Sequence, residues 1–222
     1  KVKLIGLDLE EPEQTFDRVL VSVGRVPNSR NIGLENTSIE TDDKGFIKVD
    51  AQRRTTVSNV FAIGDVAGEP GLAHKATHEA PVAVRTAADD AAAWDPACIP
   101  AVVFTDPEVA WVGLSETEAL NRNVPHKVTT FPWAASGRAI TLDRPEGLTK
   151  LIVSPNGRLL GCGIVGVGAG DLISEAALAI EMGTTVEDLA MTIHPHPTLS
   201  ETLMEAAELH LGHSPHYMPR KK

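Results

Sequence analysis

Apolar and polar residues alternate with a period of two near the start of the chain, as they do in strands with one buried face. Four short apolar runs predict strands, at residues 2–9, 19–23, 46–49 and 59–65. The polar stretch 10–14 separates the first two runs as a turn. A segment rich in small residues, from Thr77 to about Trp94, predicts a helix. The first part of the chain therefore predicts an α/β arrangement.

The pattern changes after a proline-rich stretch at 95–100, which predicts a domain boundary. Beyond it, apolar runs predict strands at 101–104, 109–112, 126–131, 148–153 and 158–167. The sequence SPNG at 154–157 is a strong hairpin signal between the last two. Helices are expected after the capping box at 115–118, and at 171–182, 186–191 and 199–211. We therefore expect an α+β domain with an antiparallel sheet.

The composition is that of a globular protein, with 222 residues and 42% hydrophobic content. A formal charge of −10 disfavours nucleic acid as a partner, because no patch of basic residues could neutralise phosphates. No run approaches the ~20 apolar residues of a membrane helix, and no signal-like segment opens the chain. We expect a cytoplasmic protein, or a mitochondrial-matrix protein if the source is eukaryotic. Because Lys1 is not an initiator Met, we also expect a longer protein.

Two features that could carry redox or nucleotide chemistry do not fit that chemistry here. Cys98 and Cys162 are too far apart for a CxxC or CxxxxC redox pair, which favours incidental or buried thiols. Residues 161–166 match GxGxxG, but Ile164 and Val165 continue an apolar strand instead of opening a helix. We therefore predict that these glycines belong to a strand packed closely against another element.

Asp65 stands at the end of an apolar run and is followed by a glycine-containing loop and a helix. In open α/β sheets, ligands bind beyond the carboxyl ends of the strands, and helix N-termini there favour anionic or electron-rich groups. Asp65 could therefore accept hydrogen bonds from sugar-like hydroxyl groups. A turn or capping role for Asp65 is the alternative.

The segment 194–201, HPHPTLSE, places two histidines between prolines and a carboxylate shortly after them. Thr198 and Glu201 fit a capping box, which would make Glu201 structural. An imidazole held beside Glu201 would instead have its tautomer oriented for acid–base chemistry. A metal site would need further ligands, for which the local supply is His210, His213 and His216. The residues alone leave the acid–base pair and the plain cap as equal alternatives, with a metal site as the weaker third.

Six segments resemble the pyridine nucleotide-disulfide oxidoreductases, and among them the dihydrolipoamide dehydrogenases. They are VSVGRVPN at 21–28, VFAIGD at 60–65, LAHKATHEA at 72–80, VFTDPEVAWVG at 103–113, GDLISEAALAIEMG at 170–183 and HPHPTLSE at 194–201. The resemblance is to the C-terminal half of these enzymes. Leu199 departs from the polar residues of the glutathione-specific members, and the tail lacks the cysteine pair of mercuric reductases. These two relatives are the runner-up alternatives.

The resemblance implies a division of the chain and a redox reaction. Residues 1–23 would end an NAD-binding domain, 24–96 would complete an FAD-binding domain, and 97–222 would form an interface domain. The family passes electrons from dihydrolipoamide to an active-site disulfide, then to FAD and then to NAD+. The FAD and NAD fingerprints and the CxxxxC disulfide of the family have no counterpart in this sequence. We therefore expect the isolated chain to be inactive.

The resemblance also assigns site residues and partners. His196 corresponds to the catalytic base, and Glu201 to the carboxylate that orients it. Asp65 corresponds to the acid on the ribitol side of FAD, and the segment Leu72, Ala73 and His74 to the loop and helix start against the flavin. The His196–Pro197 bond is cis in similar enzymes.

Partners follow from the same resemblance. We expect a homodimer through residues 97–222, and dihydrolipoamide presented by the acyltransferase component of a 2-oxo acid dehydrogenase complex. The rival hypothesis is a dimerisation or FAD-contacting module without activity of its own.

Overall fold

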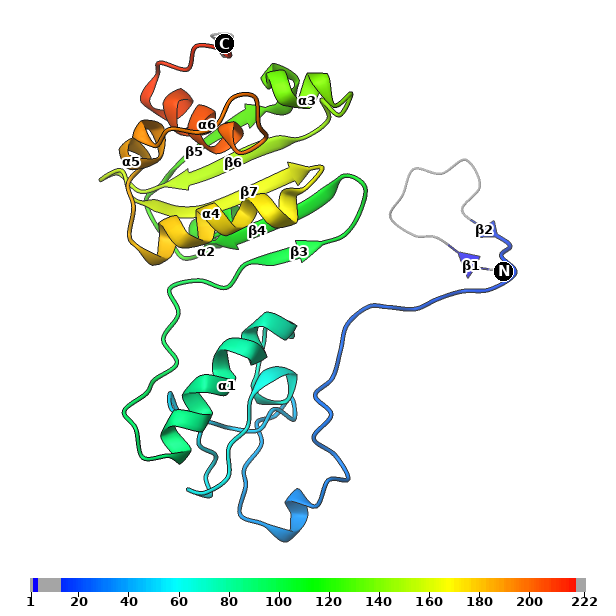
Figure 1. Ribbon diagram of the computed structural model, residues 1–222. Helices are drawn as coiled ribbons and strands as arrows, with labels where there is room; N and C mark the ends of the chain where they lie inside the picture. Colours follow the sequence, from blue (N-terminus) through cyan, green and yellow to red (C-terminus); the bar gives the residue numbers. More distant parts are fainter. Residues whose placement is uncertain (1, 4–12, 219–222) are drawn as a thin grey trace. The chain divides into compact units, whose positions relative to one another are not determined.

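The computed structural model describes residues 2–3 and 13–218. The chain divides into two compact units, Lys1–Ala92 and Ala93–Lys222. In Figure 1 the first runs in colour from blue to blue-green and the second from green to red. The division into NAD-binding, FAD-binding and interface domains stays a prediction.

The first unit has little regular secondary structure. Its elements are β1 (Val2–Lys3), β2 (Glu13–Gln14), the 3-10 helices η1 (Leu34–Asn36) and η2 (Gly64–Ala67), and α1 (Ala73–Ala87). β1 pairs with β2 in an antiparallel ladder, and α1 lies against η2. Isolated bridges join Thr41 to Ile47 and Arg54 to Phe61.

The strands predicted in this unit are mostly wrong. Residues 19–23 are extended but unpaired within the described part of the chain, and Leu20 and Val23 are more than 90% exposed. A strand is stable only when a neighbour takes its backbone hydrogen bonds, and this run has no such neighbour there. The runs at 46–49 and 59–65 shrink to single bridges, and residues 4–9 lie outside the described residues.

The helix of this unit begins earlier and ends earlier than predicted. It covers Ala73–Ala87 instead of 77–94, and Pro81 lies inside it. The early start follows from the buried side chain of Lys75, which reaches back to the carbonyl oxygens of Gly64 and Gly68. The early end follows from Asp89, whose positive φ of 61° ends the helical backbone.

The second unit is built on a five-stranded antiparallel sheet, as predicted. The strands are β3 (Ala101–Val103), β4 (Glu108–Gly113), β5 (Lys127–Pro132), β6 (Leu148–Val153) and β7 (Leu159–Gly166). They lie in the order β3-β4-β7-β6-β5. The two central pairings, β4 with β7 and β6 with β7, place the predicted hairpin in the middle of the sheet.

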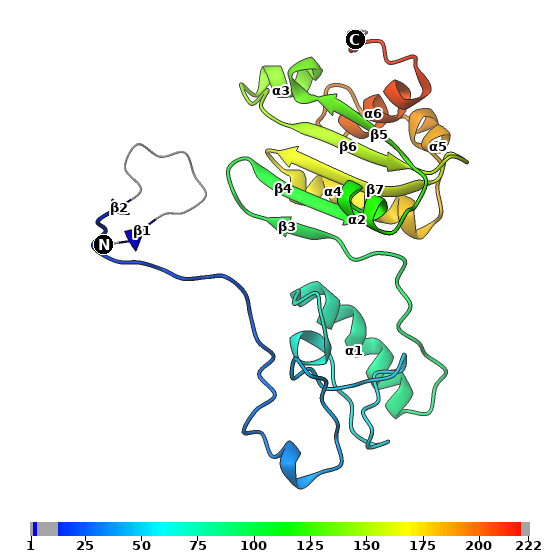
Figure 2. The same cartoon turned by 180° about the vertical axis from the view of Figure 1, so that it is seen from behind.

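Helices cover the sheet unequally. The long helices are α4 (Ala169–Glu181) and α6 (Glu201–Leu211), and the short ones are α2 (Glu116–Asn121), α3 (Gly137–Thr141) and α5 (Val186–Met191), with a 3-10 turn η3 at Trp133–Ala135. α4, α5 and α6 lie over one face in Figure 1, and Figure 2 shows the sheet from the other side. In the part of the chain that the structure describes, no helix is long and apolar enough to cross a bilayer.

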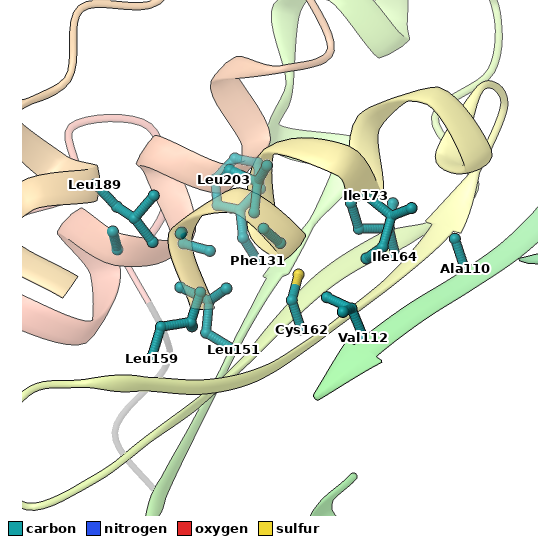
Figure 3. Close-up of a cluster of buried hydrophobic side chains, with 14 of the residues drawn as sticks. Ala110, Val112, Phe131, Leu151, Leu159, Cys162, Ile164, Ile173, Leu189 and Leu203 are labelled. Carbon is teal, nitrogen blue, oxygen red and sulfur yellow. The ribbon is translucent and has the colours of Figure 1, made fainter. Parts of the chain in front are cut away.

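The core lies between the sheet and these three helices. Figure 3 shows Cys162 pointing into it beside Leu151 and Val112, with Ile173 and Leu203 contributed by the helices. Burial raises the pKa of the Cys162 thiol, and the nearby Glu175 charge adds to the effect. Cys162 is therefore a neutral, buried thiol, as the sequence predicted, and belongs to the packing of the core.

The GxGxxG segment lies within β7, which confirms the prediction of a closely packed strand. A Cβ added to Gly161 would lie 1.9 Å from the carbonyl oxygen of Leu114, and one added to Gly166 would lie 2.2 Å from the indole ring of Trp133. A Cβ on Gly163 would meet nothing within 4 Å. The two outer glycines are therefore required by close contacts, and the middle one is not.

We predict that Gly161→Ala lowers the free energy of unfolding by about 1–3 kcal/mol, because the added methyl group must displace backbone atoms of Leu114. Gly163→Ala, two residues away on the same strand, is the matched control. It should leave stability within about 0.5 kcal/mol of the parent or slightly above it. Urea unfolding followed by fluorescence measures both, and equal losses in the two variants would contradict this packing account.

Candidate functional site

The two residues that the sequence suggests as an acid–base pair, His196 and Glu201, are in contact. The Nδ1 atom of His196 lies 2.9 Å from the Oε1 atom of Glu201. The imidazole is 74% exposed, whereas the carboxylate is only 16% exposed. The His196–Pro197 peptide bond is cis, as in the enzymes that the sequence resembles. A largely buried carboxylate therefore holds an imidazole that faces outward.

Both oxygens of Glu201 are occupied. Oε2 accepts a hydrogen bond of 2.7 Å from the backbone N–H of Thr198, and Oε1 accepts one from His196. Desolvation raises the pKa of Glu201, but the hydrogen bonds from Thr198 and His196 together outweigh it and lower the pKa. The ionised carboxylate fixes the proton of a neutral His196 on Nδ1, which leaves the lone pair of Nε2 pointing outward.

The predicted capping box is only half right. Glu201 reaches back to the N–H of Thr198, but the hydroxyl of Thr198 donates to the carbonyl oxygen of Pro195, not to the helix. The helix begins at Glu201 with Ser200 before it, and Ser200 makes no side-chain capping bond. Thr198 therefore stabilises the proline-flanked segment, and Glu201 combines a backbone contact with its contact to His196.

A buried chain of hydrogen bonds fixes the start of α6. The indole N–H of Trp133 donates to the hydroxyl of Thr149 at 3.0 Å, and that hydroxyl donates to Thr202 at 2.9 Å. The hydroxyl of Thr202 donates to the carbonyl oxygen of Leu199 at 2.8 Å. The chain connects η3, β6 and α6, and it ends two residues before Glu201. The position of the carboxylate is thus set by the core.

The other histidines of this region have separate partners. His194 contacts Glu175, His210 lies 2.9 Å from the hydroxyl of Thr129, and His216 contacts Glu205. Among the described residues, no group of three or more His, Cys, Asp or Glu side chains could hold a metal ion. The imidazoles are distributed over different acceptors instead of converging on one point.

The residues expected at a cofactor lie together in the first unit. Asp65 belongs to the first turn of η2, and its Oδ2 atom lies 3.0 Å from Nη1 of Arg25 at the surface. Leu72 precedes α1 without a side-chain capping bond, and Ala73 and His74 form the first, exposed turn of that helix. The order of an acidic residue, a loop and the start of a helix is therefore as expected, and the role of these residues stays a prediction.

A buried ionic network supports this loop. Glu79, which is fully buried, accepts from Arg53 at 2.9 Å, from Lys75 at 3.0 Å and from the backbone N–H of Gly64 at 2.6 Å. Lys75 in turn donates to the carbonyl oxygens of Gly64 and Gly68, both at 3.1 Å. These backbone contacts of Glu79 and Lys75 fall on Gly64, directly before Asp65, and on Gly68 in its loop. The network therefore determines where the Asp65 carboxylate stands.

The sequence alone does not single out these supporting residues. Lys75 and Glu79 are four apart on a helix, a spacing that signals an ion pair, whereas nothing in the sequence around Arg53 points to them. Glu175 and Glu205, the partners of two histidines, also gave no local signal because they are distant in sequence from the residues they contact.

Two family descriptions match the chain. Residues 3–80 match the pyridine nucleotide-disulphide oxidoreductase family, and residues 99–207 match the pyridine nucleotide-disulphide oxidoreductase dimerisation domain. The matches are in chain order and together leave only short stretches uncovered.

Similar proteins named dihydrolipoyl dehydrogenase occur in distant organisms. The one from Vibrio cholerae is 47% identical over 95% of this chain and 45% of its own length. Those from Haemophilus influenzae and Halobacterium salinarum are 50% and 49% identical, over 89% and 96% of this chain and 41% and 45% of their own lengths. The chain therefore spans less than half the length of each of these relatives.

Solved structures give the same result for the fold. LpdA from Mycobacterium tuberculosis matches with a TM-score of 0.76 and 29% identity, over 83% of this chain and 40% of its own. The HOCl-induced flavoprotein disulfide reductase RclA from Escherichia coli matches with a TM-score of 0.78 and 26% identity, over 85% and 44%. From its antiparallel sheet, its matched domains and these relatives, the chain belongs to the pyridine nucleotide-disulfide oxidoreductase family.

Proposed function

We propose that the chain supplies the acid–base pair of a dihydrolipoyl dehydrogenase, which oxidises dihydrolipoamide to lipoamide and reduces NAD+. The observation that carries the proposal is the 2.9 Å contact between an exposed His196 and a largely buried Glu201. The relatives at 45–50% identity that bear this name support the choice of substrate.

The proposal gives each residue a role that its contacts support. Nε2 of His196 takes the proton from a thiol of dihydrolipoamide, which leaves a thiolate as the nucleophile. The imidazolium formed in this step is stabilised by Glu201, whose carboxylate remains ionised because Thr198 donates to it. Cys98 and Cys162 do not form the redox disulfide, since both are free thiols and Cys162 is buried in the core. In this proposal the disulfide would come from residues outside this sequence.

The first unit fits a flavin cofactor. Asp65, which is half exposed beside Arg25, would offer its carboxylate to ribitol hydroxyls, and Gly71 places no side chain over it, since a Cβ there would lie 3.2 Å from Oδ2. Leu72, Ala73 and His74 would contribute the uncapped start of α1 beside the ring. FAD supplies the electron acceptor and NAD+ the hydride acceptor when they are bound.

We further propose a homodimer through residues 97–222, for which the match to a dimerisation domain at 99–207 is the support. The dihydrolipoamide would be carried by the acyltransferase component of a 2-oxo acid dehydrogenase complex. The bacterial relatives favour the cytoplasm as its compartment.

We predict that the full-length protein carrying this sequence reduces NAD+ with dihydrolipoamide, and that His196→Gln lowers turnover by roughly 10²- to 10⁴-fold. Steady-state kinetics measures this, with FAD content checked by absorbance. His126→Gln, a variant of a histidine before β5, is the control and should keep full turnover. If the flavin-loaded parent is inactive, the chain is a module without this activity. Unchanged turnover in His196→Gln would remove His196 from the mechanism.

For Glu201→Gln we predict a milder loss of turnover, about tenfold, because the amide keeps part of the hydrogen bonding but no charge. The lowered pKa of Glu201 means that its ionised form stabilises the fold above the usual Glu range, and that this contribution is lost as the pH falls through the lowered value. A loss of about 1 kcal/mol in stability with unchanged kinetics would instead indicate a cap only.

Glu79→Gln should lower FAD affinity by about tenfold, equivalent to 1.4 kcal/mol, because the loop that holds Asp65 loses its support. It also removes the carboxylate charge that Lys75 and Arg53 both contact, which costs roughly 3–5 kcal/mol of stability. Flavin fluorescence titration and urea unfolding of the full-length protein measure the two effects. Glu40→Gln, which removes an exposed ion pair with Lys48 in the same unit, is the matched control. Equal FAD affinity in both variants would argue against the supporting role.

A further inference from the structure

His194 and His196 are two residues apart but have opposite surroundings. The side chain of His194 is 4% exposed, whereas that of His196 is 74% exposed. Pro195 lies between them, and the chain bends at His196 and Pro197, so the two side chains do not share one face as residues i and i+2 of a regular strand would. The segment therefore presents one imidazole outward and inserts the other into the protein.

Both ring nitrogens of His194 face hydrogen-bond acceptors. Nδ1 lies 2.8 Å from the backbone carbonyl oxygen of Thr192, and Nε2 lies 2.8 Å from Oε1 of Glu175. A neutral imidazole carries one N–H and one lone pair, so it can satisfy only one acceptor. The carbonyl oxygen at Nδ1 and the carboxylate oxygen at Nε2 both receive a hydrogen bond when each ring nitrogen carries a proton.

We propose that His194 is an imidazolium ion paired with Glu175, and that this pair is the positioning element which fixes the segment carrying His196. The inference rests on the proposed function for the effect on catalysis. His194 and Glu175 touch neither substrate nor reacting atoms in this scheme, and act through the placement of His196.

The surroundings favour this charge state. Glu175 belongs to α4, and its Oε1 atom lies 2.8 Å from Nε2 of His194, so the carboxylate would pair directly with the charged ring. Thr192 follows the last turn of α5, where carbonyl oxygens favour a positive donor. The imidazolium thus joins the end of α5 to the middle of α4.

The pair determines where the segment after α5 runs. The other contacts of residues 192–197 are local: Thr192 bonds to Asp188, Thr198 to Pro195, and His196 contacts Glu201. A catalytic group displaced by about 1 Å can lose up to ~10²-fold in rate. A smaller effect is expected here because Glu201 also holds His196 directly.

Two isosteric variants separate the two contacts of His194. The amide nitrogen of glutamine reaches the position of Nε2, and that of asparagine reaches the position of Nδ1. His194→Asn therefore keeps the donor to Thr192 only, and should lower kcat/KM for dihydrolipoamide about tenfold in the full-length enzyme. His194→Gln keeps the donor to Glu175 and should stay within about threefold of the parent. KM for NAD+ should not change in either variant.

The matched control is His126→Gln. Nδ1 of His126 lies 2.7 Å from the carbonyl oxygen of Val124, two residues back, which is the same local contact that His194 makes with Thr192. Unchanged kinetics in this variant shows that loss of such a local contact alone has no effect. Equal losses in His194→Asn and His194→Gln would overturn the role of Glu175.

A double-mutant cycle tests the pair itself. Because both changes disrupt one interaction, the variant that combines His194→Asn with Glu175→Gln should lose no more activity than the worse single variant. A loss equal to the product of the two single losses would overturn the proposal, since it would show that the residues act independently.

The charge state has a readout that does not need activity. In the full-length protein labelled with ¹⁵N-histidine, both nitrogens of His194 should give protonated-type signals at neutral pH, assigned by their disappearance in His194→Gln. Signals of a neutral imidazole would overturn the inference. His196→Gln, assayed alongside, distinguishes failure of one proposal from failure of the other. Full turnover in that variant would contradict the proposed function, whereas the spectrum alone decides the charge state of His194.

Discussion

The start of helix α6 depends on the buried hydrogen-bond chain that runs from Trp133 through Thr149 and Thr202 to the carbonyl oxygen of Leu199. Buried polar networks of this kind are costly when incomplete and rigid when satisfied. Here the network is satisfied by the sheet on one side and the helix on the other. Glu201 is the first residue of that helix, so an exposed imidazole acquires a fixed place from the core of the second unit.

Carboxylates from two helices hold the two histidines of the HPHPTLSE segment. Glu175 on α4 holds the inserted imidazole, and Glu201 on α6 holds the exposed one. The first unit uses the same principle, since the carboxylate of Glu79 accepts from two cations and from the N–H of Gly64 beside Asp65. In each case a carboxylate on an α-helix fixes a short segment that belongs to no α-helix or paired strand.

Whether a feature could be predicted from the sequence depends on how far apart in the chain the contacting residues lie. The strands of the second unit were predictable because each pairs within the chain and buries one face, whereas the run at 19–23 has the same alternation but no paired neighbour among the described residues. The His196–Glu201 pair was predictable in outline because its members are close in sequence. Glu175 and Arg53 could not be found this way, since their contacts are created only when distant segments pack together.

The glycines of β7 bear on how short motifs are interpreted. Gly161 and Gly166 satisfy the spacing of a phosphate-binding loop, but they lie against the backbone of Leu114 and the ring of Trp133. A motif scan would therefore assign an anion to a place that the protein fills with an indole. A pair of glycines such as Gly161 and Gly166 shows only that a side chain does not fit there. The neighbouring group decides whether the glycines make room for a ligand or for the packing of the fold.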